Sequence, residues 1–268
     1  MNPYIEILRP SVCLMTLLGI VIGSVVAGVL TSPILIVLAV IASVLITGAG
    51  NALNDYYDIE TDKINAPKRV LPSGRMKPKN VPPYTFLLYS FGIVISFIIS
   101  YWFLFLAILN VFISTAYAMK LKKTPLVGSI GVSWLGASAF LAPSLFFNPA
   151  IILEVLLLSS IAFFGSLSRE VLKAIRDVEG DKKIGAKTLP IVIGEKKSFA
   201  LAAVFLLIGC VLLAVPFLLS LFNVFYLIGA VPAILLCLYA LTQKAPKAQK
   251  LVKIAIYLVF LGFMLGSI

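Results

Sequence analysis

The sequence contains no histidine, little charge and few cysteines. Only 12% of its 268 residues are charged, about half the share found in soluble domains. Without histidine, an imidazole base, a histidine haem ligand and a histidine zinc site are all excluded. The three cysteines, Cys13, Cys210 and Cys237, lie inside apolar runs at spacings that match no metal site, and we interpret them as small core residues. The low share of charged residues, together with the apolar content described next, excludes an ordinary soluble protein.

Long apolar runs dominate the chain instead. Apolar residues make up 61% of the sequence, and the mean hydropathy is +1.09. Because one membrane-spanning helix needs about 20 apolar residues, we predict an all-α, polytopic membrane protein built as a bundle of nine transmembrane helices. The predicted spans cover residues 11–30, 34–55, 84–101, 103–119, 126–146, 150–172, 198–220, 224–243 and 250–267. We expect a single membrane-embedded domain over residues 1–268, in which spans one to four and five to eight form two related halves.

The positive charges alternate along these spans. Lysine and arginine, which give a net charge of +11, fall in the N-terminal segment and around the connections after spans two, four, six and eight. The connections near 31–33, 101–102, 147–149 and 221–223 carry no charge. The positive-inside rule therefore predicts a cell-membrane protein whose N-terminus and charged loops are cytoplasmic.

An acidic cluster follows the second span. Asn51, Asp55, Asp58 and Asp62 recur at intervals that place all four on one helical face if the helix continues through them. Three carboxylates on one face at a membrane boundary need a cation between them, because desolvation and repulsion would otherwise protonate them. Oxygen-only ligands favour Mg²⁺ over zinc, and Mg²⁺ commonly completes its coordination with water and substrate phosphate. The alternative is a solvated acidic helix end.

A second acidic cluster, Asp177 and Asp181, ends the sixth span. Arg169 and Lys173 precede it at helical spacing, so one face of this helix is basic and then acidic. The loop after the first cluster, 63–83, is rich in proline and is expected to form an ordered cap. Spans seven to nine carry charge only near their cytoplasmic ends and are expected to close the bundle.

Two acidic clusters among basic side chains indicate a site for a polyanion bridged by metal. A diphosphate fits, because Mg²⁺ and arginine or lysine together neutralise its charge, most strongly when it departs as a leaving group. An allylic carbocation left behind would be attracted to aromatic faces. The catalytic candidates are Asp55, Asp58, Asp62, Asp177 and Asp181, which with Asn51 are also the metal-ligand candidates. The substrate-binding candidates are Arg9, Asn51, Asn54, Lys68, Arg69, Tyr117, Lys120, Lys122, Lys173 and Arg176.

The motifs resemble those of a known family. N-D-Y-Y-D-I-E-T-D and D-V-E-G-D, with the K-R-V-L-P-S-G loop and the later T-L-P, are similar to the paired motifs of the UbiA-type intramembrane prenyltransferases. The resemblance covers nearly the whole chain and implies a nine-span fold in which the two acidic clusters bind diphosphate through Mg²⁺, with two ions bridged by the substrate. It also implies phosphate contacts from Arg69, Lys173 and either Lys120 or Lys122. Members often carry lysine where this chain has Leu121, which leaves that choice open.

The resemblance is strongest to the archaeal branch of the family. It implies transfer of a geranylgeranyl group from its diphosphate to the free hydroxyl of geranylgeranylglyceryl phosphate, in ether-lipid biosynthesis. The partners are then a prenyl diphosphate, a membrane-resident lipid acceptor and the bilayer, with no nucleic acid, and the oligomeric state is left open. Two alternatives remain: an aromatic prenyltransferase of quinone or haem biosynthesis, and a cation-coupled transporter. The transporter is disfavoured because no carboxylate lies in the middle of a span.

Overall fold

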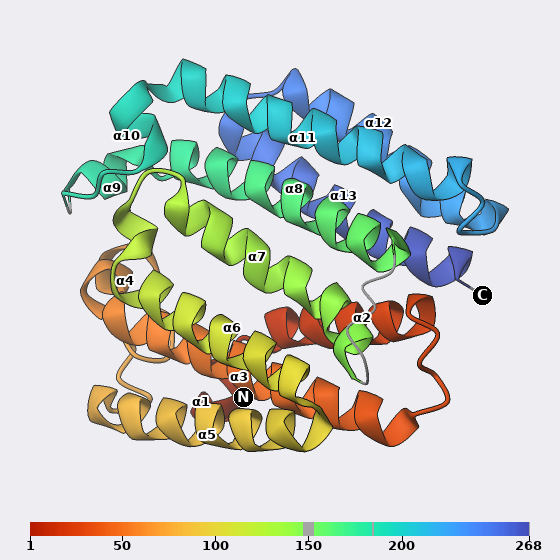
Figure 1. The fold of residues 1–268 in the computed structure, drawn as a ribbon. Coiled ribbons are helices and arrows are strands. Elements are labelled where there is room, and N and C mark those ends of the chain that lie inside the picture. Colours follow the sequence, from red (N-terminus) through yellow and green to blue (C-terminus); the bar gives the residue numbers. More distant parts are fainter. Residues whose placement is uncertain (147–152, 184, 268) are drawn as a thin grey trace.

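The computed structural model describes residues 1–146, 153–183 and 185–267, and the described residues form helices without a strand (Figure 1). In the first part of the chain the elements are α1 (Pro3–Glu6), α2 (Pro10–Val26), α3 (Pro33–Tyr57), α4 (Ile59–Asn65), η1 (Pro78–Asn80), α5 (Val81–Ile99), α6 (Tyr101–Met119), η2 (Leu121–Lys123), α7 (Val127–Leu141) and η3 (Ala142–Leu145). They are followed by α8 (Leu153–Arg176), α9 (Val178–Lys183), α10 (Leu189–Ile193), α11 (Glu195–Leu218), η4 (Val224–Tyr226), α12 (Leu227–Leu241) and α13 (Ala245–Gly266).

A helix lies on each of the nine predicted spans. Within the described ranges, eight helical segments are long and apolar enough to cross a membrane. The remaining one, α2, is apolar but has 17 residues, a length of about 26 Å at 1.5 Å per residue. The protein is therefore a multi-pass, all-helical membrane protein, while the count of nine crossings stays a prediction. The predicted connection at 147–149 and the predicted start of the sixth span at 150 lie outside the described residues.

Ser100 separates the helices of the third and fourth predicted spans. Its backbone is extended, its hydroxyl accepts a hydrogen bond from the Phe103 amide at 3.0 Å, and it donates one to the carbonyl of Leu145. A serine that satisfies a free amide at a helix start is a favourable N-cap. The apolar stretch is therefore two helices, α5 and α6, as predicted.

The helices form two groups that meet across the middle of the molecule. In the first group α3 packs against α2, α5 and α6, and in the second α8 packs against α11 and α13 while α12 packs against α13. Helix α7 contacts α2 and α6 on one side and α8 on the other, so it joins the two groups (Figure 1). Close approach at α12 and α13 depends on Gly229 and Gly262, where a Cβ on Gly229 would lie 2.4 Å from the Gly262 amide nitrogen.

The proline-rich loop after α4 is ordered, as predicted. Val70, Leu71 and Met76 are buried in a small core with Ile7 and Val81. This core fixes the loop over the same end of the bundle at which α3 and α8 end. Both acidic clusters are therefore held at one end of the molecule.

Candidate active site

A cavity of about 1040 Å³ opens between the two groups of helices. Its walls are largely apolar and come from α2, α3, α6, α7, α8, α11, α12 and α13. Apolar wall residues include Phe103, Leu106, Phe140, Leu206, Leu213 and Phe263. Charged side chains gather where the two acidic clusters end their helices. The cavity thus combines a charged mouth with an apolar interior large enough for a chain-like ligand.

Each acidic cluster lies at a helix junction. Helix α3 ends at Tyr57 and α4 begins at Ile59, so Asp58 stands between them with φ −97° and ψ 2°. Asp177 occupies the same place between α8 and α9. The condition for a single helical face, that the helix continues through all four residues, is therefore not met at Asp58, although the Asp62 amide still bonds the Asp58 carbonyl at 2.8 Å. Because of these breaks, the last acid of each cluster lies on a separate short helix: Asp62 on α4 and Asp181 on α9.

Cations pair with the acids of the first cluster. Arg69 bonds Asp62 at 2.6 Å and lies 3.5 Å from Asp55, which also pairs with Arg9. Lys122 bonds Asp58 at 2.5 Å. Asp55 does not line the cavity itself but lies behind Arg9 and Arg69, which do. Its geometry is suited to holding these two arginines in place.

Burial changes the pKa of Asp62, the acid of α4 that lines the cavity. Burial raises the pKa of Asp62, the nearby charges of Asp55 and Asp58 raise it further, and Arg69 opposes the increase. The second cluster is similar, because burial raises the pKa of Asp181, to which the charge of Asp177 adds. A raised pKa means that the carboxylate form lacks sufficient positive charge around it. Both positions would gain from a bound cation.

The amide side chains supply further oxygen atoms. Asn51 donates to the carbonyl of Leu8 at 3.0 Å, and Asn54 donates to Asp58 at 3.0 Å. The Oδ1 atom of Asn54 is buried without a hydrogen-bond partner, and Asn54 lines the cavity. Within the described ranges no three acidic side chains converge on one point. The donor set nevertheless fits Mg²⁺, since it consists of carboxylate and amide oxygens and includes an oxygen that still lacks a partner.

The second cluster has its own arginine. Arg176 donates to both oxygens of Asp177 at 2.7 and 2.8 Å. Lys173, Asp177 and Asp181 all line the cavity. The two clusters, about 120 residues apart in the sequence, therefore contribute to the wall of one cavity.

The basic candidates divide into two sets. Arg9, Arg69, Lys122, Lys173 and Arg176 line the cavity, as does Tyr117. Lys68 and Lys120 are exposed and are absent from its lining. Helix α6 ends at Met119, and the following turn η2 directs Lys122 to Asp58. The geometry therefore favours Lys122 over Lys120.

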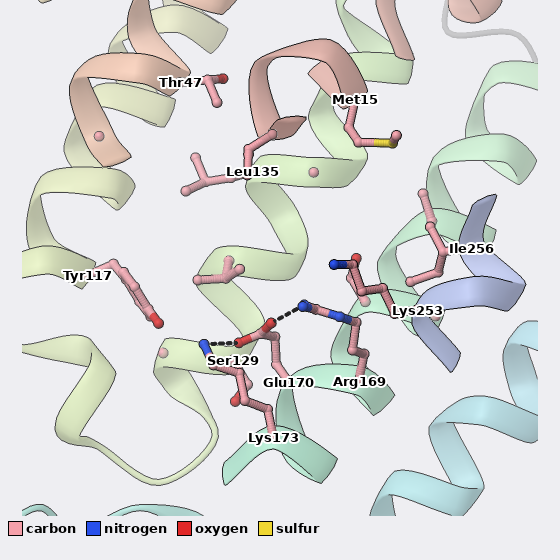
Figure 2. Close-up of a pocket in the computed structure, with 18 of the residues that line it drawn as sticks. Met15, Thr47, Tyr117, Ser129, Leu135, Arg169, Glu170, Lys173, Lys253 and Ile256 are labelled. Atoms are coloured by element: carbon pink, nitrogen blue, oxygen red, sulfur yellow. Dashed lines mark hydrogen bonds and ion pairs between the residues drawn. The ribbon is translucent and has the colours of Figure 1, made fainter. Parts of the chain in front are cut away.

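Four charged residues that line the cavity were not among the candidates from the sequence: Lys123, Arg169, Glu170 and Lys253. Glu170 is buried on α8 and pairs with Arg169 at 2.6 Å and Lys173 at 3.4 Å (Figure 2). The signal in the sequence was an acid that directly follows Arg169 and stands three residues before Lys173 in a mostly apolar helix. Lys253 lines the cavity from α13, so the expectation that the last three spans only close the bundle is wrong for α13.

Comparison with known proteins agrees with this geometry. The model of the UbiA prenyltransferase family matches residues 13–264. The chain belongs to the UbiA prenyltransferase family. Digeranylgeranylglyceryl phosphate synthase of Methanopyrus kandleri is 37% identical to it over 98% of both chains. A solved structure of a digeranylgeranylglyceryl phosphate synthase has a TM-score of 0.82 and 30% identity, and the match covers 99% of this chain and 97% of that one.

A more distant structure shares the fold. A UbiA homologue from Archaeoglobus fulgidus, solved with geranyl diphosphate and Mg²⁺ bound, has a TM-score of 0.70 and 18% identity, with 99% of this chain and 100% of that chain covered. Family membership identifies the chain as a membrane-embedded prenyltransferase, in agreement with a mouth that carries both acidic motifs.

Proposed function

We propose that the protein transfers a geranylgeranyl group from geranylgeranyl diphosphate to the free hydroxyl of geranylgeranylglyceryl phosphate and releases diphosphate. The observation that carries this proposal is one cavity that joins both acidic motifs to a long apolar interior. The full-length similarity to digeranylgeranylglyceryl phosphate synthases supports the choice of acceptor. The ether bond forms between C1 of the prenyl chain and the acceptor oxygen, as the bond from C1 to the diphosphate breaks and the hydroxyl proton is lost.

The diphosphate belongs at the charged mouth and the prenyl chain in the apolar interior. Asp58, Asp62, Asp177 and Asp181 would hold two Mg²⁺ ions, with amide oxygens of Asn51 and Asn54 nearby. When bound, the metal supplies positive charge that stabilises the departing diphosphate. This assignment is supported by the raised pKa of Asp62 and of Asp181 and by the unpartnered oxygen of Asn54.

The basic residues would then exchange partners. Without substrate, Arg69 and Lys122 neutralise Asp62 and Asp58. With these carboxylates neutralised by a bound cation, the guanidinium and ammonium groups would be available for phosphate oxygens, which arginine matches with two parallel hydrogen bonds. Tyr117 lines the cavity and presents an aromatic face to the carbocation character that develops at C1.

The mouth is placed on the cytoplasmic side of the cell membrane in this proposal. The alternation of charged and uncharged connections supports that orientation. A cytoplasmic mouth gives a water-soluble diphosphate headgroup direct access to the charged residues, while the lipid acceptor stays in the bilayer.

The test is an assay with purified protein, geranylgeranyl diphosphate and Mg²⁺, with products identified by mass. We expect digeranylgeranylglyceryl phosphate from geranylgeranylglyceryl phosphate and no product after the metal is removed with EDTA. Faster prenylation of 4-hydroxybenzoate, a naphthoate or a porphyrin would establish the aromatic alternative instead. Cation flux into liposomes without any prenyl product would contradict prenyl transfer altogether.

A further inference from the structure

The register between α8 and α13 places two cations opposite each other. Arg176 of α8 donates to Gln249 of α13 at 3.3 Å. Further along, a Cβ on Gly165 would lie 3.9 Å from Ile256. Residue numbers rise along α8 while they fall along α13, so the two helices run antiparallel.

Arg169 and Lys253 fall between these two contact points. Arg169 lies one turn from Gly165 toward the end that carries Arg176, and Lys253 lies one turn from Ile256 in the same direction. The two side chains therefore stand at the same depth on facing helices. Both line the cavity, and Figure 2 shows them between Glu170 and Ile256.

Lys253 has no carboxylate partner among the residues that the structure describes. Its ammonium lies 5.9 Å from the ring centre of Tyr257, on its own helix. Helix α13 carries no acidic residue. Lys253 is exposed, and an ammonium at the cavity without a counter-ion attracts an anion.

Arg169 has capacity for the same anion. Among the residues that the structure describes, only its Nη1 atom has a partner, in the bond to Glu170 at 2.6 Å. The remaining N–H donors of its planar guanidinium suit two oxygens of one phosphate. Glu170 and Lys173 stand between this pair and the second acidic cluster, so an anion held here is distinct from a diphosphate at the carboxylates.

We propose that Arg169 and Lys253 bind the phosphate of the lipid acceptor. The inference rests on the proposed function, since it assumes an acceptor that carries a phosphate monoester. It divides the two anionic headgroups: the aspartate clusters take the diphosphate, and the α8–α13 pair takes the acceptor phosphate. The pair would thereby select phosphorylated acceptors over neutral lipids and over aromatic acids of similar size.

Lys253→Gln tests the inference, and Lys250→Gln is its matched control. Lys250 is exposed on the same helix and is absent from the cavity lining. We expect Lys253→Gln to raise the apparent KM for geranylgeranylglyceryl phosphate by about 10-fold or more, as loss of a charge-assisted hydrogen bond does. The KM for geranylgeranyl diphosphate should change little, and Lys250→Gln should resemble wild type. Lys253→Arg, which keeps the charge, should restore most of the acceptor affinity.

A neutral acceptor completes the test. Wild type should bind geranylgeranylglycerol, which lacks the phosphate, more weakly than the phosphate, and Lys253→Gln should remove most of that difference. The inference is overturned if Lys253→Gln raises both KM values equally, or if wild type does not discriminate between the two acceptors while it still forms the ether product. Failure of wild type to prenylate any glycerol lipid would instead contradict the proposed function. Melting temperatures of all variants separate lost binding from misfolding.

Discussion

Four acidic side chains at the mouth are each paired with a cation, and the strength of those pairs differs. Asp177 is 40% exposed and bonds the neighbouring Arg176, whereas Asp55 is 7% exposed and pairs with Arg9 and Arg69. Exposed pairs contribute about 0–1 kcal/mol to stability, while a buried charge that loses its partner costs considerably more. Acids that are alike in the motif therefore have different structural roles.

Asp177→Asn should lower turnover by several orders of magnitude and leave the melting temperature of the purified protein near that of wild type. The substitution removes a proposed metal ligand but only a partly exposed ion pair. Asp55→Asn should lower turnover and also destabilise the fold, by roughly 1–3 kcal/mol, because Arg9 and Arg69 lose their common partner. Turnover assays and thermal melts measure both effects. Full activity in Asp177→Asn would contradict its role as a metal ligand.

Sequence reasoning located the acids but could not resolve every cation. The motifs and the charge pattern sufficed to name Asp58, Asp62 and Asp177 because they depend on local spacing. The choice between Lys120 and Lys122 depends on the turn η2, whose direction is set by packing rather than by the residues themselves. Lys253 was missed because its relation to Arg169 follows from the register of α8 on α13, which are separated by about 80 residues in the sequence.

At the scale of elements, α1 and the loop over the mouth are joined by one ion pair. Arg75 donates to both oxygens of Glu6 at 2.6 and 2.7 Å and to the carbonyl of Lys68 at 2.9 Å. These contacts tie the N-terminal helix to the loop that carries Arg69. The position of Arg69, for which we propose phosphate binding, is thus coupled to the N-terminal helix.

Hydrogen bonds from Arg75 hold the pKa of Glu6 below its usual value of 4.5. As the pH falls, the Glu6 carboxylate is therefore protonated near pH 4.5 in the unfolded chain and at a lower pH in the folded protein. The ion pair stabilises the fold fully above pH 4.5, and the stabilisation is lost as the pH falls through the lowered pKa. We expect Glu6→Gln to melt at a lower temperature than wild type at neutral pH, with a difference that shrinks below pH 4.5. Glu60→Gln, which removes an exposed pair inside α4, should show no such trend.

The contact between α12 and α13 makes a second test at this scale. A Cβ on Gly229 would lie 2.2 Å from the carbonyl oxygen of Leu258, and the backbone of α13 cannot yield without moving the helix. Gly229→Ala should therefore destabilise the protein by about 1–3 kcal/mol. Gly209→Ala is the control, since the nearest atom to its Cβ would be 3.7 Å away. Equal melting temperatures for the two variants would show that the helices can separate without cost.

At the scale of elements, the structure differs from the sequence-based expectation mainly at the two helix junctions. The intervals between the acids predict one continuous helical face, and the backbone hydrogen bonds do continue past Asp58 and Asp177. The long helices nevertheless end at these residues, and the short helices α4 and α9 begin directly after them. The regular spacing of the acids carries no information about such a break.

For the whole molecule, the positions of the helices along the chain could be predicted from the sequence more completely than the contacts in the site. Apolar length and the uncharged connections predicted helices in the correct places, since a span needs an internally bonded helix whatever its neighbours are. The orientation in the membrane depends on the charges outside the spans. The loop near Lys77 and the α2–α3 connection at Thr31 should then lie on opposite sides.

A cysteine-labelling experiment checks this orientation. Cys13, Cys210 and Cys237 are first replaced, and a single cysteine is then placed at Lys77 or Thr31, both of which are exposed. In intact cells a membrane-impermeant thiol reagent should react with the cysteine at 31 and not with the one at 77, and both should react after the membrane is opened. The opposite pattern would place the charged mouth outside the cell, where the site could not meet cytoplasmic prenyl diphosphates. Because the basic loops on one side carry most of the net charge of +11, inverting the molecule would require translocating them against the positive-inside preference.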